Sequence, residues 1–270
     1  MFSPRTDLAI EHQTITDKKI GEGFRHRHAE NGDMTVDTVE ILDKNGEKAL
    51  QRPKGVYITL TFDRPSHPDL SKSIAKEIGR LLSPDCRRIL TVGIGNRDIT
   101  ADAIGPLVAK GIRVTGHLEN VDGKRHFAFS PDVLGKTGIE SLALIERARE
   151  ASSADAVIVV DALAAQSLKR LYKTVQIGSG GIVPGSGVGN HRAAITKESL
   201  GVPVIAVGVP TVVSSATLVH DTLKGTSLSS LYEKLDPILR DMEPFFVTPP
   251  DADTDTEILA AAIAEAINSL

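Results

Sequence analysis

The sequence predicts an α/β fold with a mainly parallel sheet and an N-terminal β extension. Short apolar runs at residues 88–95, 156–160 and 202–209 have the length and composition of buried parallel strands. Segments with helical periodicity lie between these runs, and strands that alternate with helices are typical of a parallel sheet. The 270 residues, of which 41% are hydrophobic, are enough for one large packed domain.

The N-terminal part of the chain predicts the β extension. Residues 35–41 and 55–62 alternate between polar and apolar side chains, and a turn-forming Asn-Gly pair lies between them at residues 45–46. We therefore expect two strands, paired through a longer loop. His26 and His28 precede the first of these strands and are potential metal ligands, but solvated loop histidines are the preferred interpretation.

The helical segments follow in order along the chain. Residues 67–82 carry apolar side chains on one helical face, and a second helix is expected over residues 138–151. Thr211 follows the third apolar run and is expected to cap a helix that continues towards Leu223. The Ala-rich pattern of residues 257–270 indicates a terminal helix.

Composition excludes several classes of protein. The formal net charge of −4 and the pI near 6.1 provide no basic surface for wrapping nucleic acid. The single cysteine, Cys86, rules out an internal disulfide, and no run reaches the roughly 20 apolar residues of a membrane span. The first residues lack the basic and then apolar pattern of a signal peptide. We expect a cytoplasmic protein without direct nucleic-acid or membrane partners.

Two aspartates are expected to meet at one edge of the sheet. Asp102 lies near the start of the helix that follows residues 88–95, and Asp161 directly follows residues 156–160. The carboxyl ends of parallel strands share one edge, where open α/β sheets bind ligands. A carboxylate pair there can share a proton and activate a water, or hold a metal whose bound water attacks. Asp98, in the intervening turn, is a third candidate, with local backbone capping as its preferred role.

A glycine-rich segment at residues 178–192 predicts a binding loop. Glycine-dense loops expose backbone N–H groups and permit a ligand to approach closely. The segment lacks the Lys-Ser/Thr of a P-loop and the third glycine of a dinucleotide fingerprint. A nucleotide role therefore has weak support, and a plain surface loop is the alternative. His191 in this loop and His117, beyond the strand-like residues 112–115, are candidate ligands or substrate contacts.

The first residues of the chain look like a protease cleavage site. Residues 5–11 read Arg-Thr-Asp-Leu-Ala-Ile-Glu, with an acidic residue before Leu-Ala and another three places beyond the leucine. This segment resembles the self-processing site of the germination proteases of spore-forming bacteria. Those enzymes cut small acid-soluble spore proteins within Thr/Ser-Glu-(Phe/Ile/Leu)-Ala-Ser-Glu. Segments similar to further motifs of that family occur in the family's order at residues 93–96, 100–106, 114–118, 160–163, 184–190 and 201–213.

The resemblance implies an endopeptidase that is made as a zymogen and cuts itself between Asp7 and Leu8. Residues 1–7 are then a short pro-segment, and residues 8–270 form a single α/β peptidase domain with a three-layer fold similar to that of the hydrogenase maturation proteases. The resemblance also implies a homotetrameric zymogen in the forespore or spore core. The substrates that the resemblance implies are small acid-soluble spore proteins.

The resemblance also assigns residues to the site. Asp102 and Asp161 match the two essential aspartates of the family. The chain departs from the family at Gly116, where an arginine is expected, and its segment after residue 214 matches no family motif. The candidate substrate contacts are Gly185, Ser186, Gly187, Gly189, Asn96 and His117.

Two other functions compete with the aspartic-type endopeptidase. A metal-assisted peptidase would use the same two aspartates as ligands, and a chelator test separates the two mechanisms. A non-enzymatic α/β module would capture an anion or nucleotide at the glycine-rich loop, and it would cleave no acidic small protein. We expect no cofactor, with a divalent metal at the aspartate pair left open.

Overall fold

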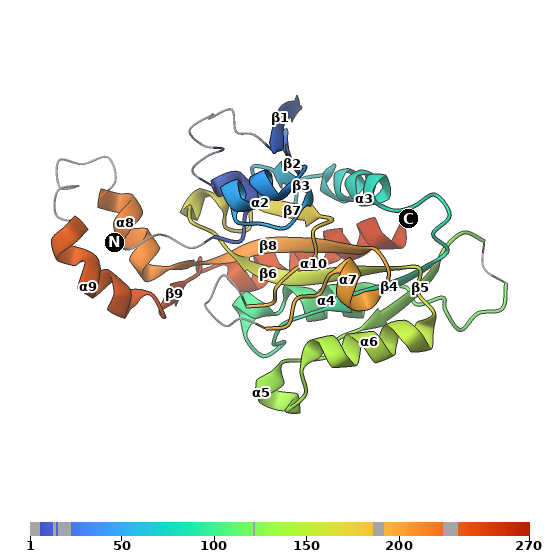
Figure 1. Ribbon diagram of the computed structural model, residues 1–270. Coiled ribbons are helices and arrows are strands. Elements are labelled where there is room, and N and C mark those ends of the chain that lie inside the picture. Colours follow the sequence, from blue (N-terminus) through green and yellow to red (C-terminus); the bar gives the residue numbers. More distant parts are fainter. Residues whose placement is uncertain (1–5, 13–14, 16–22, 121, 186–191, 224–231) are drawn as a thin grey trace.

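A nine-stranded sheet forms the centre of the molecule. The computed structural model describes residues 6–270 except 13–14, 16–22, 121, 186–191 and 224–231 (Figure 1). The strand order is β1-β2-β3-β7-β8-β6-β4-β5, and β9 (Phe246–Val247) pairs with β8 outside this path.

The parallel half of the sheet confirms the strands expected from the apolar runs. It consists of β8 (Val204–Ser214), β6 (Ala156–Ala164), β4 (Arg88–Gly93) and β5 (Arg125–Phe129). Every residue of β6 except Ala162 is buried. Burial on both faces explains why this strand reads as an almost continuous apolar run.

The other half of the sheet is antiparallel. β7 (Thr174–Gly178) pairs with β8, β3 (Gly55–Thr61) with β7, and β2 (Met34–Ile41) with β3. The expected β extension is therefore continuous with the central sheet. Parallel pairing is restricted to the centre and one edge, so the sheet is mixed to a greater extent than the sequence predicts.

The N-terminal edge strand was not expected from the sequence. β1 (Phe24–Asn31) pairs with β2, and all of its residues except Phe24 are exposed, so it has no apolar alternation to reveal it. His26 and His28 are exposed, as expected, but they lie in this strand and not in a loop. His26 Nε2 and His28 Nδ1 each lie 2.9 Å from Asp37 Oδ1. β5 was missed as well, and the strand-like residues 112–115 form no strand.

Two further local expectations are corrected. Residues 44–50 form a short helix, α2 (Lys44–Leu50), because the Asp43 side chain caps it by accepting hydrogen bonds from two backbone N–H groups. Thr211 is not a helix cap. It continues β8, where its hydroxyl donates to the Ala101 carbonyl at 2.6 Å, and α8 (Ser215–Leu223) begins only after this strand.

Helices cover both faces of the sheet and complete the three layers (Figure 1). α3 (Leu70–Leu81), α4 (Ile104–Gly111) and α10 (Ala252–Asn268) pack on one face. α6 (Ser141–Ser152) and α7 (Lys197–Leu200) pack on the other. α9 (Tyr232–Met242) pairs with α8 at one end of the molecule. None of the helices in the described ranges has both the length and the apolar character needed to cross a membrane.

Glycines allow α4 to approach the central strands. A β carbon on Gly105 would lie 2.1 Å from the Ile94 carbonyl oxygen and 2.5 Å from that of Val160, and one on Gly93 would lie 2.0 Å from the Gly105 carbonyl oxygen. Real side chains do not fit at such distances, so both positions require glycine. This close contact fixes the turn between β4 and α4, which carries Asp102.

Candidate active site

A cavity of about 950 Å³ lies beyond the carboxyl end of β4, against one face of β6, β7 and β8. Both predicted aspartates line it, together with Asn96 and the described part of the glycine-rich segment. The structure thus brings together the segments that the sequence argument selected. Other polar residues on its wall include Asp7, Gln51, Arg52, Gln176 and Arg192.

Asp161 is the most deeply buried carboxyl group of the cavity. It lies within β6, which continues to Ala164 rather than ending at the aspartate, and it is 5% exposed. Burial raises the pKa of Asp161 well above its ordinary value, and the carboxylates of Asp102 and Asp7 raise it further. The backbone N–H of Ala162 donates to Asp161 Oδ1 at 2.9 Å and opposes this rise. Asp161 therefore favours the protonated form.

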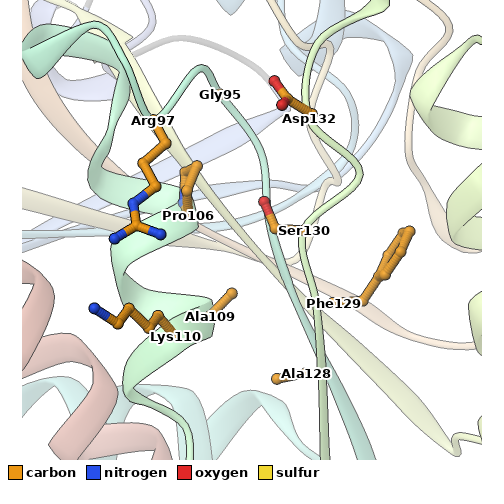
Figure 2. Close-up of a pocket in the computed structure, with 9 residues that line it drawn as sticks. All are labelled: Gly95, Arg97, Pro106, Ala109, Lys110, Ala128, Phe129, Ser130 and Asp132. Atoms are coloured by element: carbon orange, nitrogen blue, oxygen red, sulfur yellow. The ribbon is translucent and has the colours of Figure 1, made fainter. Parts of the chain in front are cut away.

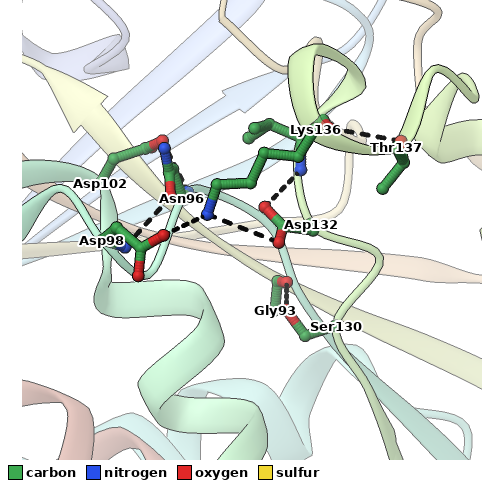
Figure 3. A network of polar contacts seen from close by, with 9 residues as sticks. Gly93, Asn96, Asp98, Asp102, Ser130, Asp132, Lys136 and Thr137 are labelled. Carbon is green, nitrogen blue, oxygen red and sulfur yellow. Dashed lines mark hydrogen bonds and ion pairs between the residues drawn. The ribbon is translucent and has the colours of Figure 1, made fainter.

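Asp102 is held by the turn that follows β4. It ends the short 3-10 helix η2 (Thr100–Asp102), and its Oδ2 accepts a hydrogen bond of 2.7 Å from the Asn96 backbone N–H (Figure 3). Gly95 permits this approach, since a β carbon there would lie 2.1 Å from the Asp102 carbonyl oxygen. Burial raises the pKa of Asp102, the Asn96 hydrogen bond lowers it, and Asp132 raises it. Asn96 thus positions Asp102 through its backbone.

Asp98 does not join the aspartate pair. Its carboxylate is exposed and lies 2.6 Å from Lys136 Nζ, which also lies 3.6 Å from Asp132 (Figure 3). The Asp98 backbone N–H donates to Asn96 Oδ1 at 3.0 Å. Lys136 thereby links the turn after β4 to the segment after β5. The third candidate from the sequence is a surface ion-pair residue.

A second, smaller cavity lies on the other side of the same turn. It has a volume of about 320 Å³ and is lined by Arg97, Lys110, Ser130 and Asp132 among others (Figure 2). Neither Asp102 nor Asp161 lines it. The larger cavity is therefore the candidate active site.

The N-terminal segment is docked beside the aspartate pair. Leu8 is fully buried, and Ala9 is 1% exposed. The Asp7 backbone N–H donates to the Ala164 carbonyl at 2.9 Å, and the Ala164 N–H donates to Asp7 Oδ2 at 2.9 Å. The bond between Asp7 and Leu8 is thus tied to the strand that carries Asp161.

Gln176 holds the peptide unit around this bond from the neighbouring strand. Its Nε2 donates to the Asp7 carbonyl oxygen at 3.0 Å, and its Oε1 accepts from the Ala9 N–H at 2.7 Å. In the sheet register, Asp161 pairs with Gly208, and Gly208 pairs with Gln176. Residues in register point to the same face of a sheet, so Asp161 and Gln176 flank a position that has no side chain.

The described part of the glycine-rich segment borders the cavity. Gly180, Gly181 and Gly185 line it, and Gly181 and Gly185 have positive φ. A backbone bridge between Ile182 and Ile195 closes the segment at its base. The predicted contacts Ser186, Gly187 and Gly189, and also His191, lie outside the described residues.

His117 is not part of the candidate site. It is exposed in the turn before β5 and does not line either described cavity. Its neighbour Gly116 donates a hydrogen bond to the His126 carbonyl, next to Arg125, which pairs with Arg88 at the start of β4. This is the opposite end of β4 from Asp102. A β carbon on Gly116 would lie 2.1 Å from the Phe127 ring, which explains the departure from arginine there.

Comparison with known proteins decides the family. The family model described as germination protease matches residues 5–227. The chain belongs to the germination protease family. The matched range contains the docked N-terminal segment, both aspartates and Gln176.

Curated members of the family cover nearly the whole chain. The germination protease of Clostridium perfringens is 37% identical, over 99% of this chain and 95% of its own length. That of Caldanaerobacter subterraneus is 37% identical, over 98% and 93%. That of Bacillus subtilis is 40% identical, over 81% of this chain and 66% of its own length. The predicted family is confirmed, and with it a spore-germination peptidase.

One of the solved structures that resemble the fold is a NiFe hydrogenase maturation protease from Thermococcus kodakarensis, with a TM-score of 0.40 and 20% identity. The match covers 71% of this chain and 98% of the other. Likeness at this level carries no information about the activity of this chain.

Sequence reasoning missed two polar residues of the cavity that bind the N-terminal segment, Gln176 and Arg52. Gln176 is 9% exposed in a strand whose neighbours Val175 and Ile177 are fully buried. A polar residue at an inward position needs a hydrogen-bond partner, and that signal was available. Arg52 donates from Nη2 to the Thr6 carbonyl at 2.9 Å. Nothing in its local sequence distinguishes it from a surface arginine.

Proposed function

We propose that the chain is an endopeptidase, made as a self-processing zymogen, that starts the degradation of small acid-soluble spore proteins in the spore core. Its reacting groups are Asp102 and Asp161, and its own first substrate is the bond between Asp7 and Leu8. The observation that carries the proposal is the docking of this bond between Gln176 and the strand of Asp161. Membership of the germination protease family supports the substrate class.

The carboxyl pair works with one shared proton. Burial and the carboxylates of Asp102 and Asp7 raise the pKa of Asp161 well above its ordinary value, and burial also raises the pKa of Asp102. Asp161 is the more deeply buried of the two, so in this mechanism it holds the proton and Asp102 is ionised. Asp102 takes a proton from a water molecule as the water oxygen attacks the Asp7 carbonyl carbon. Asp161 gives its proton to the leaving nitrogen of Leu8. One water is consumed, and the products are a carboxyl group on residue 7 and an amine on residue 8.

Gln176 assists this step from the strand beyond Gly208. Its Nε2–H group already donates to the oxygen on which negative charge develops. Donors placed in advance at such an oxygen stabilise the transition state. The second hydrogen bond, from the Ala9 N–H to Gln176 Oε1, prevents the amide from rotating away.

Mass spectrometry of purified protein tests the proposal. The wild type, held at mildly acidic pH, should lose residues 1–7 and give a product that begins at Leu8. Asp102→Asn and Asp161→Asn should each abolish the loss, and the double variant should be scarcely worse than either, because the two groups act as a unit. Asp98→Asn is the matched control and should cleave normally, since Asp98 is exposed and paired with Lys136.

Either of two results of this assay would count against the proposal. One is a product that begins at a residue other than Leu8. The other is near-normal cleavage by either aspartate variant whose fold is shown intact by circular dichroism. The wild type should also cleave a peptide that contains Thr-Glu-Phe-Ala-Ser-Glu, and failure to do so would favour the non-enzymatic binding module.

The metal-assisted alternative makes a different prediction. Within the described ranges, no three His, Cys, Asp or Glu side chains are grouped to hold a metal ion. If a metal nevertheless acts between the two aspartates, a chelator stops cleavage and added divalent metal restores it. The shared-proton mechanism predicts no effect of either treatment. The zymogen is proposed to be a homotetramer, which sedimentation of the Asp161→Asn protein measures directly.

A further inference from the structure

A buried carboxylate lies four residues after the proposed cleavage site. Glu11 Oε2 accepts a hydrogen bond of 2.7 Å from the Gln166 N–H, and Oε1 accepts one of 3.0 Å from the Ser167 N–H. Arg170 Nε lies 3.3 Å from Oε1, and the Glu11 side chain is 5% exposed. The Thr6 hydroxyl donates to Oε2 as well. The two backbone donors, Gln166 and Ser167, are 155 and 156 residues from Glu11 in the sequence.

These contacts have the properties of a specific carboxylate site. Burial of a carboxylate costs free energy unless hydrogen bonds and an opposite charge replace the lost water. Burial raises the pKa of Glu11, and the Thr6 hydroxyl, the two N–H groups and the Arg170 guanidinium oppose that rise and offset part of the cost. Hydrogen bonds to a charged group are stronger than those between neutral groups. A surface glutamate that merely covered the core would need none of them.

The site is connected to the reacting group by one short segment. β6 carries Asp161, then Ala164, which binds Asp7, and the chain continues directly to Gln166 and Ser167. The distance between the reacting carboxyl group and the carboxylate site is thereby fixed. A substrate must place an acidic side chain at one particular position after the cleaved bond to reach both.

The N-terminal segment reaches both because it is folded into a turn. An extended chain would carry the fourth residue about 13 Å beyond the bond. Here the 3-10 helix η1 (Ala9–Glu11) bends the chain back, and the Leu8 N–H donates to the Thr6 hydroxyl at 3.0 Å. Thr6 then contacts the Glu11 carboxylate, so a hydroxyl two residues before the leucine and a carboxylate three after it close the turn together.

From these contacts we infer that Gln166, Ser167 and Arg170 form a specificity site for an acidic side chain four positions after the cleaved bond of protein substrates. The chain's own Glu11 fills this site before a substrate does. The inference rests on the proposed endopeptidase function, and it adds which residues select the substrate. It also makes the N-terminal segment a competitor of substrates for the same contacts.

Opposite effects in two assays test this inference. In the full chain, Glu11→Gln should slow the release of residues 1–7 about tenfold, because the charge-assisted contacts are lost. The same variant should cleave a separate peptide more readily. That peptide repeats residues 5–11 with short flanks, and its KM should fall about threefold or more, because the weakened segment competes less. A purely structural role of Glu11 would not improve cleavage of the peptide.

A second experiment tests whether Arg170 recognises the acidic side chain of the substrate. Arg170→Gln should raise the KM of the glutamate peptide about tenfold and leave that of its Glu→Gln analogue within about twofold, with kcat unchanged. Lys169→Gln removes the same charge from the exposed neighbouring residue and is the matched control. Adding Glu11→Gln to the Arg170→Gln chain should cause little further loss of self-cleavage, since both changes remove one interaction.

The outcomes separate the inference from the function on which it rests. A wild type that cleaves neither itself nor any peptide overturns the endopeptidase function. A wild type that cleaves both peptides with equal KM overturns only the carboxylate site. The same conclusion follows if Arg170→Gln keeps the preference for glutamate. If Arg170→Gln does not fold, the KM values of the wild type for the two peptides and the cleavage rates of the Glu11→Gln chain still test the carboxylate site.

Discussion

Replacing Gln176 by methionine is expected to slow cleavage at the Asp7–Leu8 bond strongly without disturbing the sheet. Methionine has a similar length and remains apolar in a strand whose neighbours are buried. It can neither donate to the Asp7 carbonyl, now 3.0 Å from Nε2, nor accept from the Ala9 N–H, now 2.7 Å from Oε1. Both contacts to the reacting peptide unit are lost together.

The size of the effect follows from these two hydrogen bonds. Loss of one donor to a developing oxyanion lowers kcat about 100- to 1000-fold. The Ala9 N–H, on a residue 1% exposed, loses its acceptor, and a buried unpaired N–H costs about 1–3 kcal/mol. That second cost loosens the docked segment. We therefore expect self-cleavage at least about 100-fold slower than in the wild type.

The assay is the first-order rate of release of residues 1–7, followed by mass spectrometry. Thr174→Val is the matched control on the same strand. Its hydroxyl is buried without a hydrogen-bond partner, so its removal should leave the rate unchanged and should not lower stability. If Gln176→Met cleaves within about threefold of this control, the role assigned to the Gln176 amide is wrong.

Three further predictions concern pH and packing. Release of residues 1–7 should accelerate as the pH falls from neutral to mildly acidic, because the raised pKa of Asp161 favours the singly protonated aspartate pair. A rate that does not change with pH, or that rises with pH, would refute the shared-proton mechanism. Because that pKa is raised on folding, the carboxyl group's contribution to stability is present below its unfolded pKa of about 3.9 and is lost as the pH rises through the folded pKa. Asp161→Asn should therefore melt higher than the wild type at neutral pH, by about 2–4 °C for each kcal/mol, and the gain should vanish in acid. Gly105→Ala should lower both melting temperature and activity, because its β carbon would lie 2.1 Å from the Ile94 carbonyl oxygen, whereas Gly79→Ala, with open space around it, should be neutral or stabilising.

The apolar pattern predicted the centre of the molecule well. Strands buried on both faces have almost continuous apolar sequences, so β4, β6 and β8 were recognised, and their parallel direction placed Asp102 and Asp161 near one another. β1 was missed because an edge strand with exposed side chains needs no apolar alternation. β5 was missed for another reason: it is short, its outer positions are only half-buried, and its buried position is the polar residue His126. Thr211 was assigned to a helix cap because Pro210, which stands in β8, reads as the end of a strand.

The other half of the site depends on contacts that no local pattern contains. Gln176 and Ala164 meet the N-terminal segment across more than 150 positions of sequence. Two of the groups that hold the Glu11 carboxylate are backbone N–H groups, and every residue type except proline has one. The main-chain part of such a carboxylate site leaves no signature in side-chain identity, and its one arginine cannot be told from a surface arginine, whereas a pair of aspartates after two apolar strands can be recognised.

The exposed edge strand β1 affects how copies of the molecule meet one another. An open strand edge offers unpaired backbone groups to any extended chain, which is the usual start of fibrous aggregation. β1 presents Arg25, Arg27 and Glu30 in exposed positions. Long charged side chains remain hydrated, and they disfavour pairing of this edge with a second strand. At high protein concentration, these charged side chains therefore oppose edge-to-edge polymerisation of the sheet, because pairing through this edge would remove water from them.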